Sequence, residues 1–500
     1  MTNKPFKTKL VNYIDAGFPI IYINTFEEDK VDSILSEIKA DKKIVEWNET
    51  KGYFYQQSGT PVLAEDLNLE GALNQLSGDE EFFEGCILVL KDINAYLEDP
   101  IIVSKIKGLA KMICRGIYAN IIIVSSRLIV PKELEQYITV LEMDYLSREE
   151  IKDIINKFIS DNNMNGISEN LLDELSVAFK GLTEFEINNL LALSYSDDGE
   201  LTRKDLSLIF DQKQQMIKKA GILEMIPLNE TLDDIGGLEN LKDWFKRKAK
   251  VYKNIDKAMS FGVDMPKGVL IAGVPGCGKS LNAKAAANLF EVPLLRLDMG
   301  RLMGKYVGES EANLRNAITL AEAISPCVLW IDELEKAFAG IGGSGSGAEV
   351  TTRLFGNFLT WMQEKTSPTF VVATANDITQ LPPELLRKGR FDEIFYVGLP
   401  NNDERKKIFE IHIAKRRPSD KKKIRLTELT EKSKGFSGAD IEGVVKDAVE
   451  TAFADDKQSI DTNDILNAMK STQPLSEIMR DTLENMEREY KKRKFKNASK

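Results

Sequence analysis

The chain has 500 residues, enough for about three or four domains. Its net charge of −11 argues against extensive nucleic-acid binding, and no apolar run approaches the roughly 18 residues of a membrane span. One histidine and four scattered cysteines disfavour a zinc site and favour a reducing compartment. Without an apolar signal region near Met1, we expect a cytoplasmic protein, or one in the plastid stroma if it is organellar.

The first part of the chain, to about residue 220, alternates strand and helix patterns. Continuous apolar runs at 20–23, 86–90 and 121–124 predict parallel strands, because a sheet covered on both faces needs apolar side chains on both. Patterns at 149–159 and 187–193 predict helices. This part is therefore expected to be an α/β domain followed by helices.

The boundary between the two halves is predicted from a helix end. A helix is expected at 201–220, and Gly221 is expected to end it. Residues 226–230, which include Pro227, are then expected to form a linker. The second half begins after this linker.

A glycine-rich loop between a predicted strand and a predicted helix is the strongest motif. Residues 273–280 read G-x-x-x-x-G-K-S, after an apolar run at 268–272. Backbone N–H groups of such a loop cradle phosphate oxygens at a helix N-terminus. Lys279 is expected to reach the β- and γ-phosphates, and the Ser280 hydroxyl to bind Mg²⁺. The residues expected to line the phosphates are Gly273, Val274, Pro275, Gly276, Cys277, Gly278, Lys279, Ser280 and Leu281.

Polar residues end the next two predicted strands. The apolar run 328–331 is followed by Asp332, expected to hold Mg²⁺, and Glu333, expected to polarise the attacking water. The run 370–373 leads to Asn376. Asn376 either orients that water or senses the γ-phosphate, or it only caps the strand end.

The first half weakly repeats in the second. Runs 86–92 and 180–187 resemble runs 327–333 and 434–441, and a third pair lies between them in the same order. Three ordered matches predict an internal duplication.

The first copy lacks the residues that are predicted to bind and hydrolyse ATP in the second. Residues 24–29 read N-T-F-E-E-D where a glycine loop is expected, and Lys91 stands where the Mg²⁺-directed aspartate is expected. We expect this copy to be structural, regulatory or client-binding.

A charged helical pattern at 483–490 precedes a basic run that ends at Lys496. We expect a frayed, solvated terminus, with an electrostatic docking site as the alternative.

Six motifs then stand in the order found in AAA ATPases, which the chain resembles over about 230–475. They are Asp234-Ile235-Gly236-Gly237-Leu238, the glycine-rich loop, Gly308-Glu309-Ser310-Glu311, the strand before Asp332, Leu386-Arg387-Lys388-Gly389-Arg390-Phe391-Asp392 and Gly435-Phe436-Ser437-Gly438-Ala439-Asp440. Details at 361–365 and 373–377, with the degenerate first half, resemble the ATPases encoded by the forty-sixth hypothetical chloroplast reading frame and their cyanobacterial and bacterial relatives.

The resemblance implies assembly and additional site residues. AAA proteins commonly form hexameric rings with ATP at the subunit interfaces. Arg387 and Arg390 match arginine fingers that reach the neighbour's γ-phosphate and are typically worth about 10³ to 10⁵ in rate. The residues that match the adenine and ribose pocket and the lid are Asp234, Ile235, Gly236, Ile408, His412, Gly438 and Ala439.

The resemblance also implies a pore loop. Lys305, Tyr306 and Val307 match the loop in which an aromatic side chain grips an extended polypeptide. The alternative is that Tyr306 packs on a neighbouring helix. The glycine- and serine-rich run 340–347 matches the place of a second pore loop, but a plain flexible loop is an equally good interpretation.

We therefore predict an α/β protein with tandem AAA+-type P-loop domains, the first degenerate and the second active. Each is expected to be a parallel sheet with helices on both faces and a small helical lid. The predicted boundaries are 1–160 for the degenerate domain, 161–222 for its lid, 223–402 for the ATPase domain, 403–475 for its lid, and 476–500 for a charged, basic tail.

The predicted function is an Mg²⁺-dependent ATP hydrolase that forms a homo-oligomeric ring, with six subunits expected. It would remodel or partly unfold a protein client through the pore loop at Tyr306. The alternative is a regulatory or scaffolding switch whose ATP state controls binding to a partner without threading it. A nucleic-acid motor is a third possibility, which the acidic charge disfavours.

Overall fold

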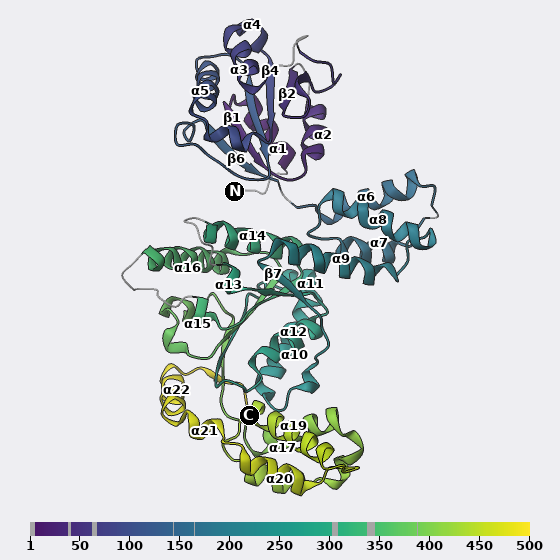
Figure 1. Ribbon diagram of the computed structural model, residues 1–500, viewed down its shortest axis with the longest axis vertical. Helices are drawn as coiled ribbons and strands as arrows, with labels where there is room; N and C mark the ends of the chain where they lie inside the picture. Colours follow the sequence, from purple (N-terminus) through teal and green to yellow (C-terminus); the bar gives the residue numbers. More distant parts are fainter. Residues whose placement is uncertain are drawn as a thin grey trace. The chain divides into compact units, whose positions relative to one another are not determined.

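The structure is a computed structural model that describes residues 6–38, 42–62, 68–143, 145–164, 166–302, 309–337, 346–387 and 389–500. The chain separates into two compact units, Met1–Leu201 and Thr202–Lys500, and each is described by itself (Figure 1). Among the described residues, no helix combines the length and apolar character needed to cross a bilayer.

Unit 1 contains a six-stranded sheet in the order β3-β2-β4-β5-β1-β6. Five strands are parallel, and the edge strand β3 runs antiparallel to β2. All residues of β4 and β5 are buried, as expected for central strands of a covered sheet. The strands are β1 (Ile20–Asn24), β2 (Lys43–Asn48), β3 (Gly52–Tyr55), β4 (Cys86–Lys91), β5 (Asn120–Ser125) and β6 (Ile138–Glu142).

Helices cover both faces of this sheet (Figure 1). Ile21 and Ile23 of β1 pack in an apolar cluster with α1 and α2, whereas Ile20 and Tyr22 pack in another with α3 and α5. Alternate residues of a strand point to opposite faces, so one strand supplies both cores. These helices are α1 (Phe6–Asp15), α2 (Glu28–Ile38), α3 (Leu69–Gly78), α4 (Glu80–Phe83) and α5 (Pro100–Cys114).

Three further helices complete unit 1: α6 (Arg148–Asp161), α7 (Glu169–Ala178) and α8 (Glu184–Asp198). α6 packs against α7 and α8, and a capping box at Ser147 and Glu150 begins it. The helical part therefore starts before the boundary predicted at 160.

Unit 2 contains a seven-stranded sheet in the order β13-β12-β8-β11-β10-β9-β7. Strand β7 lies antiparallel to β9 at one edge, and the other pairings are parallel. β7 ends where the linker was predicted to begin. The strands are β7 (Leu223–Ile226), β8 (Gly268–Gly273), β9 (Leu294–Leu297), β10 (Cys327–Ile331), β11 (Thr369–Ala375), β12 (Glu393–Val397) and β13 (Lys496–Asn497).

Two apolar clusters also sandwich this sheet. Leu270 and Ala272 of β8 pack with α14 and α16, and Val269 and Ile271 pack with α10 and α12. The helices of this part are α9 (Asp205–Ala220), α10 (Glu239–Tyr252), α11 (Ile255–Ser260), α12 (Lys279–Phe290), α13 (Met299–Leu302), α14 (Glu309–Ile324), α15 (Leu334–Ala337) and α16 (Ser346–Glu364). Helix α9 lies within the range predicted for the lid of the first copy, and in the structure it contacts β7 and contributes Ile217 to the core of unit 2.

A helical lid with its own apolar core follows β12. It consists of α17 (Asn402–Arg416), α18 (Leu426–Lys432), α19 (Gly438–Ala454) and α20 (Thr462–Ser471), after which come α21 (Leu475–Ile478) and α22 (Arg480–Arg493).

The two sheets share one strand order. Five parallel strands of unit 1, β6-β1-β5-β4-β2, correspond to β12-β8-β11-β10-β9 of unit 2, and an antiparallel strand lies beside β2 and beside β9. Unit 2 adds β13 beside β12, and its antiparallel strand β7 precedes the others in the chain, whereas β3 follows β2. Local geometry repeats too: Asp92 after β4 and Glu333 after β10 have φ of 53° and 52°. The tandem α/β arrangement predicted from the sequence is therefore confirmed.

The C-terminal segment is docked, so the prediction of a frayed, solvated terminus is wrong. Met486 and Tyr490 of α22 are buried, and the ring of Tyr490 stacks on that of Tyr396 with centroids 4.0 Å apart. β13 pairs with β12, and fully buried Ala498 donates its N–H to the Tyr396 carbonyl at 2.8 Å. Apolar burial and strand pairing outweigh the entropy lost by ordering the segment.

Replacing Tyr490 tests this docking. Tyr490→Ala should destabilise unit 2 by about 3 kcal/mol, because it deletes a buried aromatic ring. Tyr490→Phe is the matched control, since the Tyr490 hydroxyl has no hydrogen-bond partner among the described residues. Calorimetric melting should show a fall of about 5 to 10 °C for the alanine variant alone. Equal melting of both variants would contradict the docked segment.

Candidate functional site

The glycine-rich loop joins the end of β8 to the start of α12 beneath the lid. Gly276 has φ of +71°, and a Cβ there would lie 2.9 Å from the Cβ of Ala439. The Gly276 carbonyl also accepts the N–H of Ala439, in the first turn of α19, at 2.9 Å. Glycine is therefore required at 276 both by its backbone conformation and by the approach of the lid.

Lys279 lies inside this loop. Its side chain is buried, and Nζ donates to the carbonyls of Gly273 at 2.9 Å and Val274 at 2.8 Å. Burial lowers the pKa of Lys279 to about 8, although nearby acids including Asp332 act in the opposite direction. The ammonium group of Lys279 is thus mainly charged at neutral pH and loses its proton as the pH rises above about 8.

Oxygen ligands converge beside Lys279. The Ser280 hydroxyl donates to Asp332 Oδ1 at 3.1 Å, and the Thr374 hydroxyl donates to the same oxygen. Hydroxyl and carboxylate oxygens are the ligands that Mg²⁺ prefers. Thr374, on β11 two residues before Asn376, was not predicted from the sequence as a site residue.

Glu333 and Asn376 are held together at the ends of β10 and β11. Asn376 Nδ2 donates to Glu333 Oε1 at 3.2 Å, and the Glu333 N–H donates to the Thr374 hydroxyl at 3.1 Å. Buried Glu335 accepts the backbone N–H of Asn376 at 3.0 Å, and burial raises the pKa of Glu335. The left-handed backbone at Glu333 directs the chain so that these three groups meet.

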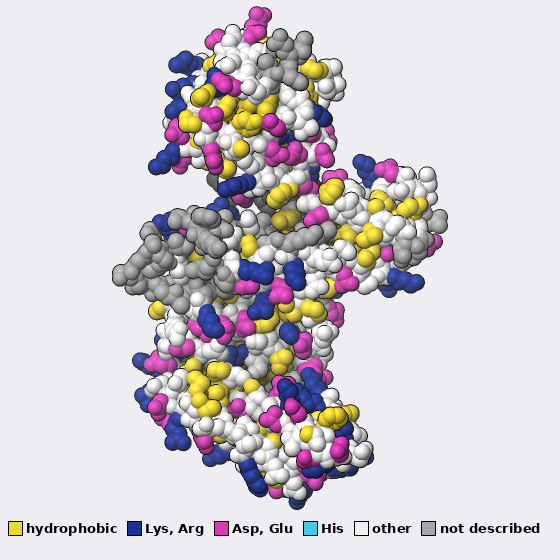
Figure 2. Space-filling model, viewed as in Figure 1, with side chains coloured by type: hydrophobic (Ala, Val, Ile, Leu, Met, Phe, Trp, Pro, Cys, Tyr) yellow, Lys and Arg dark blue, Asp and Glu magenta, His cyan; other side chains and the backbone are white. Residues whose placement is uncertain are grey.

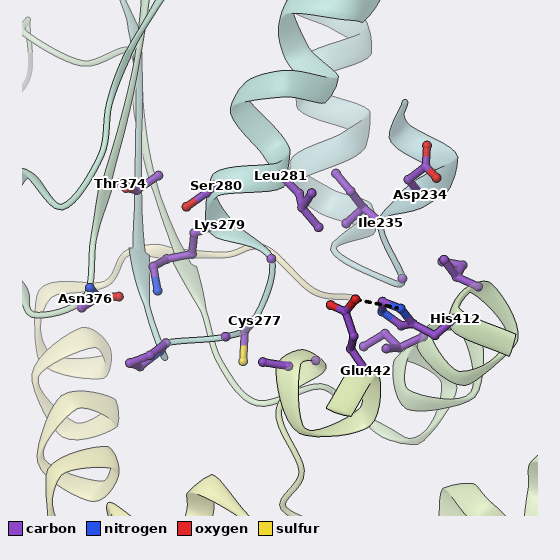
Figure 3. A pocket seen from close by; sticks show the side chains of 18 of the residues that line it. Asp234, Ile235, Cys277, Lys279, Ser280, Leu281, Thr374, Asn376, His412 and Glu442 are labelled. Carbon is purple, nitrogen blue, oxygen red and sulfur yellow. Dashed lines mark ion pairs between the residues drawn. The ribbon is translucent and has the colours of Figure 1, made fainter. Parts of the chain in front are cut away.

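The opposite side of the site comes from the 234–236 segment and the lid (Figure 3). A Cβ at Gly236 would lie 2.4 Å from Ile408 Cγ1, so a side chain there would push α17 away. His412 on α17 faces Glu442 on α19, with Nδ1 and Oε1 3.8 Å apart. Burial lowers the pKa of His412, which favours the neutral imidazole at neutral pH.

These groups line a cavity of about 390 Å³. Among the residues predicted from the sequence, it is lined by Asp234, Ile235, Gly236, Pro275, Gly276, Cys277, Gly278, Lys279, Ser280, Leu281, Asp332, Glu333, Asn376, Ile408, His412, Gly438 and Ala439. Gly273 and Val274 lie just before the cavity on the same loop. The cavity is also lined by three residues that were not predicted: Thr374, Ile411 and Glu442. Glu442 follows Gly438 by four residues and so lies on the same face of the helix, which is the signal that could have pointed to it.

The two predicted arginine fingers lie outside this cavity. Arg387 is exposed and lines a separate cavity with residues of the C-terminal segment such as Arg493. Arg390 is half-buried, and its guanidinium donates to the Glu384 carbonyl. Neither side chain therefore belongs to the site of its own chain.

The predicted pore-loop residues Lys305, Tyr306 and Val307 lie outside the described residues, as does most of 340–347. Their predicted roles stay predictions.

Comparison with known proteins identifies the family. An "Uncharacterized AAA domain-containing protein ycf46" of Guillardia theta is 39% identical over 479 residues, which cover 95% of this chain and 92% of that protein. The protein of the same name from Pyropia yezoensis is 37% identical, and the match covers 95% of each chain. The chain belongs to the ycf46 family of AAA domain-containing proteins.

Family models agree part by part. The model for the ATPase family associated with various cellular activities (AAA) matches 269–399, and that for an AAA+ lid domain matches 423–467. Models for the N-terminal and second domains of a SpoVK-like AAA ATPase match 6–143 and 149–220. The "Cell division control protein 48 homolog C" of Arabidopsis thaliana is 34% identical over 280 residues, covering 55% of this chain and 31% of that protein. Unit 2 thus contains an AAA ATPase domain with its lid, whereas the two SpoVK-like models cover unit 1 and extend through α9 to residue 220.

The pKa of Lys279 gives this site a pH dependence. Nucleotide affinity should fall above about pH 8, by up to tenfold per pH unit, because a phosphate-bound lysine must regain the proton that the free site loses. Titration with a fluorescent ADP analogue across this range measures it. Lys279→Arg is the control: arginine keeps its charge, so its affinity, though weaker, should stay level. A level profile for both proteins would contradict the lowered pKa.

Proposed function

We propose that this chain is an Mg²⁺-dependent ATP hydrolase that forms a ring and uses hydrolysis to remodel a protein client. The observation that carries the proposal is the convergence of Lys279, Ser280, Asp332 and Glu333 on one cavity. The donor set fits the nucleotide: a buried ammonium suits phosphate oxygens, and a hydroxyl beside a carboxylate suits Mg²⁺.

Each group then has a chemical role. Lys279 binds the β- and γ-phosphates, while Ser280 and Asp332 hold the metal, whose charge offsets that of the phosphates. Glu333 accepts a proton from the attacking water, and Asn376 keeps the Glu333 carboxylate in place through its 3.2 Å hydrogen bond. The apolar walls from Ile235 and Ile408 receive the base, with neutral His412 beside them.

Assembly into a ring completes the site in this proposal. Arg387 and Arg390 lie outside the cavity of their own chain, which supports a role at the γ-phosphate of a neighbouring subunit. We propose a homo-oligomer with six subunits, with Tyr306 contacting the client in the central pore. A cytoplasmic or stromal location belongs to the same proposal.

An ATP-controlled switch that binds a partner without threading it is the alternative. Unit 1 favours it in one respect, because this unit keeps the α/β fold while its own loop lacks the glycines and the lysine of a phosphate site. A nucleic-acid motor has less support, since lysines, arginines and acids are interspersed on the face shown in Figure 2 rather than gathered into a basic stripe.

Glu333→Gln tests the hydrolytic role. The variant should bind ATP normally and hydrolyse it about 10² to 10⁴ times more slowly, because the amide cannot accept the proton of the attacking water. Phosphate release and binding of a fluorescent ATP analogue measure the two effects separately. Normal hydrolysis by the variant would remove Glu333 from the proposed mechanism.

The same variant separates the two proposed functions. Purified from cells with ATP, Glu333→Gln should form a large particle that retains one or a few proteins. Adding Tyr306→Ala should release those proteins if the pore grips them. Partners that stay bound without the Tyr306 ring would favour the switch.

A further inference from the structure

Unit 1 repeats the arrangement of strands and helix start that surrounds the candidate site of unit 2. β1 occupies the place of β8 in the shared strand order, so the connection from β1 to α2 corresponds to the phosphate loop. The start of α8, after the capping box of Thr183 and Glu186, corresponds to the start of α19, after that of Ser437 and Asp440. The β1–α2 connection and the start of α8 therefore correspond to the two elements that meet at the site of unit 2.

The same close approach joins these elements in both units. In unit 1 the N–H of Glu184, the first residue of α8, donates to Glu27 Oε1 at 2.7 Å. In unit 2 a comparable bond, one residue further along the helix, runs from the N–H of Ala439, the second residue of α19, to the Gly276 carbonyl. A side-chain carboxylate thus meets the start of the helix in unit 1, whereas a backbone carbonyl does so in unit 2, and Glu28 and Asp29 in the first turn of α2 add further negative charge.

Lys91 occupies the position of the metal-directed aspartate. Its buried Nζ lies 2.6 Å from Asp32 Oδ2 and 3.1 Å from Glu46 Oε1. The positive charge is therefore neutralised by carboxylates of the chain itself. Although Lys30 follows the acids at 27–29, the loop keeps an excess of negative charge, which disfavours a nucleotide phosphate.

Exposed aromatic side chains flank the contact between Glu27 and Glu184. Phe26, which precedes Glu27, is 84% exposed, and Phe185, which follows Glu184, is 72% exposed. Tyr145 is 39% exposed, and burial of its hydroxyl, with the charges of Glu186 and Glu27, raises the pKa of Tyr145. The aromatic patch, as we define it, consists of Phe26, Phe185 and Tyr145. Large exposed rings gathered at one place are characteristic of protein-binding surfaces.

We propose that the aromatic patch is a docking site for an extended segment of a partner protein in which lysine or arginine residues flank a large apolar side chain. The rings bury the apolar side chain, and Glu27, Asp29 and Glu184 attract the basic residues on either side. In this proposal the elements of unit 1 that correspond to the nucleotide site of unit 2 bind a basic, apolar peptide in place of a nucleotide. This docking does not depend on ATP hydrolysis in unit 2.

A binding titration with the full chain tests the proposal. The probe is a short fluorescent peptide in which lysines flank one tryptophan and one leucine, and its affinity is measured by anisotropy. The double variant Phe26→Ser with Phe185→Ser should bind it at least about tenfold more weakly, because interface aromatics carry much of the binding energy. Phe453→Ser is the matched control: this ring is 83% exposed but lies on α19 of unit 2, so affinity should not change.

The charge requirement is tested with a second peptide in which glutamates replace the lysines. It should bind weakly, and added salt should weaken the binding of the lysine peptide. Equal binding of both peptides, or equal binding by wild type and double variant, would overturn the proposal. A double variant that changes particle mass in sedimentation while peptide affinity stays the same would also overturn it and assign the patch to contacts between copies. Unchanged thermal melting shows that the double variant is folded.

Discussion

One short contact constrains the whole nucleotide site: the hydrogen bond from the Ala439 N–H to the Gly276 carbonyl. It brings the start of a lid helix against the phosphate loop, and a Cβ at Gly438 would lie 3.0 Å from the same carbonyl. Small residues are therefore needed on both sides. Because the loop continues β8 and the lid continues β12, this contact also fixes how the lid closes over the ends of the central strands.

The parts of the fold that the sequence predicted are those with local patterns. The apolar runs that became β1, β4, β5, β8 and β10 are continuous because both faces of each strand are covered, and the loop at 273–280 follows a fixed spacing. β7 was missed because an edge strand is short and is defined by its partner β9, far along the chain. The docked C-terminal segment was missed for the same reason, since Tyr490 and Ala498 find their partners only in the folded protein.

The residues of the candidate site also divide into those that lie in local sequence motifs and those that only the fold brings together. Residues within motifs, such as Lys279 and Asp332, were found, whereas Thr374 and Glu442 take part through geometry that only the folded chain provides. Unit 1 differs from unit 2 at the position of the metal-directed aspartate. In unit 1 the buried Lys91 stands at the position of Asp332 in unit 2 and is paired with Asp32 and Glu46. The same fold therefore holds a cation at this position in one unit and a carboxylate in the other.

The pairing of β13 with β12 has a mechanical consequence for the lid. The lid leaves the sheet after β12, and the chain returns through α22 to β13, which lies beside β12. The lid is thus an insertion between two neighbouring strands, attached to the same sheet edge at both ends. A body held at two points turns about the line that joins them instead of swinging freely. Attachment at two neighbouring points therefore restricts the directions in which the lid can turn relative to the sheet.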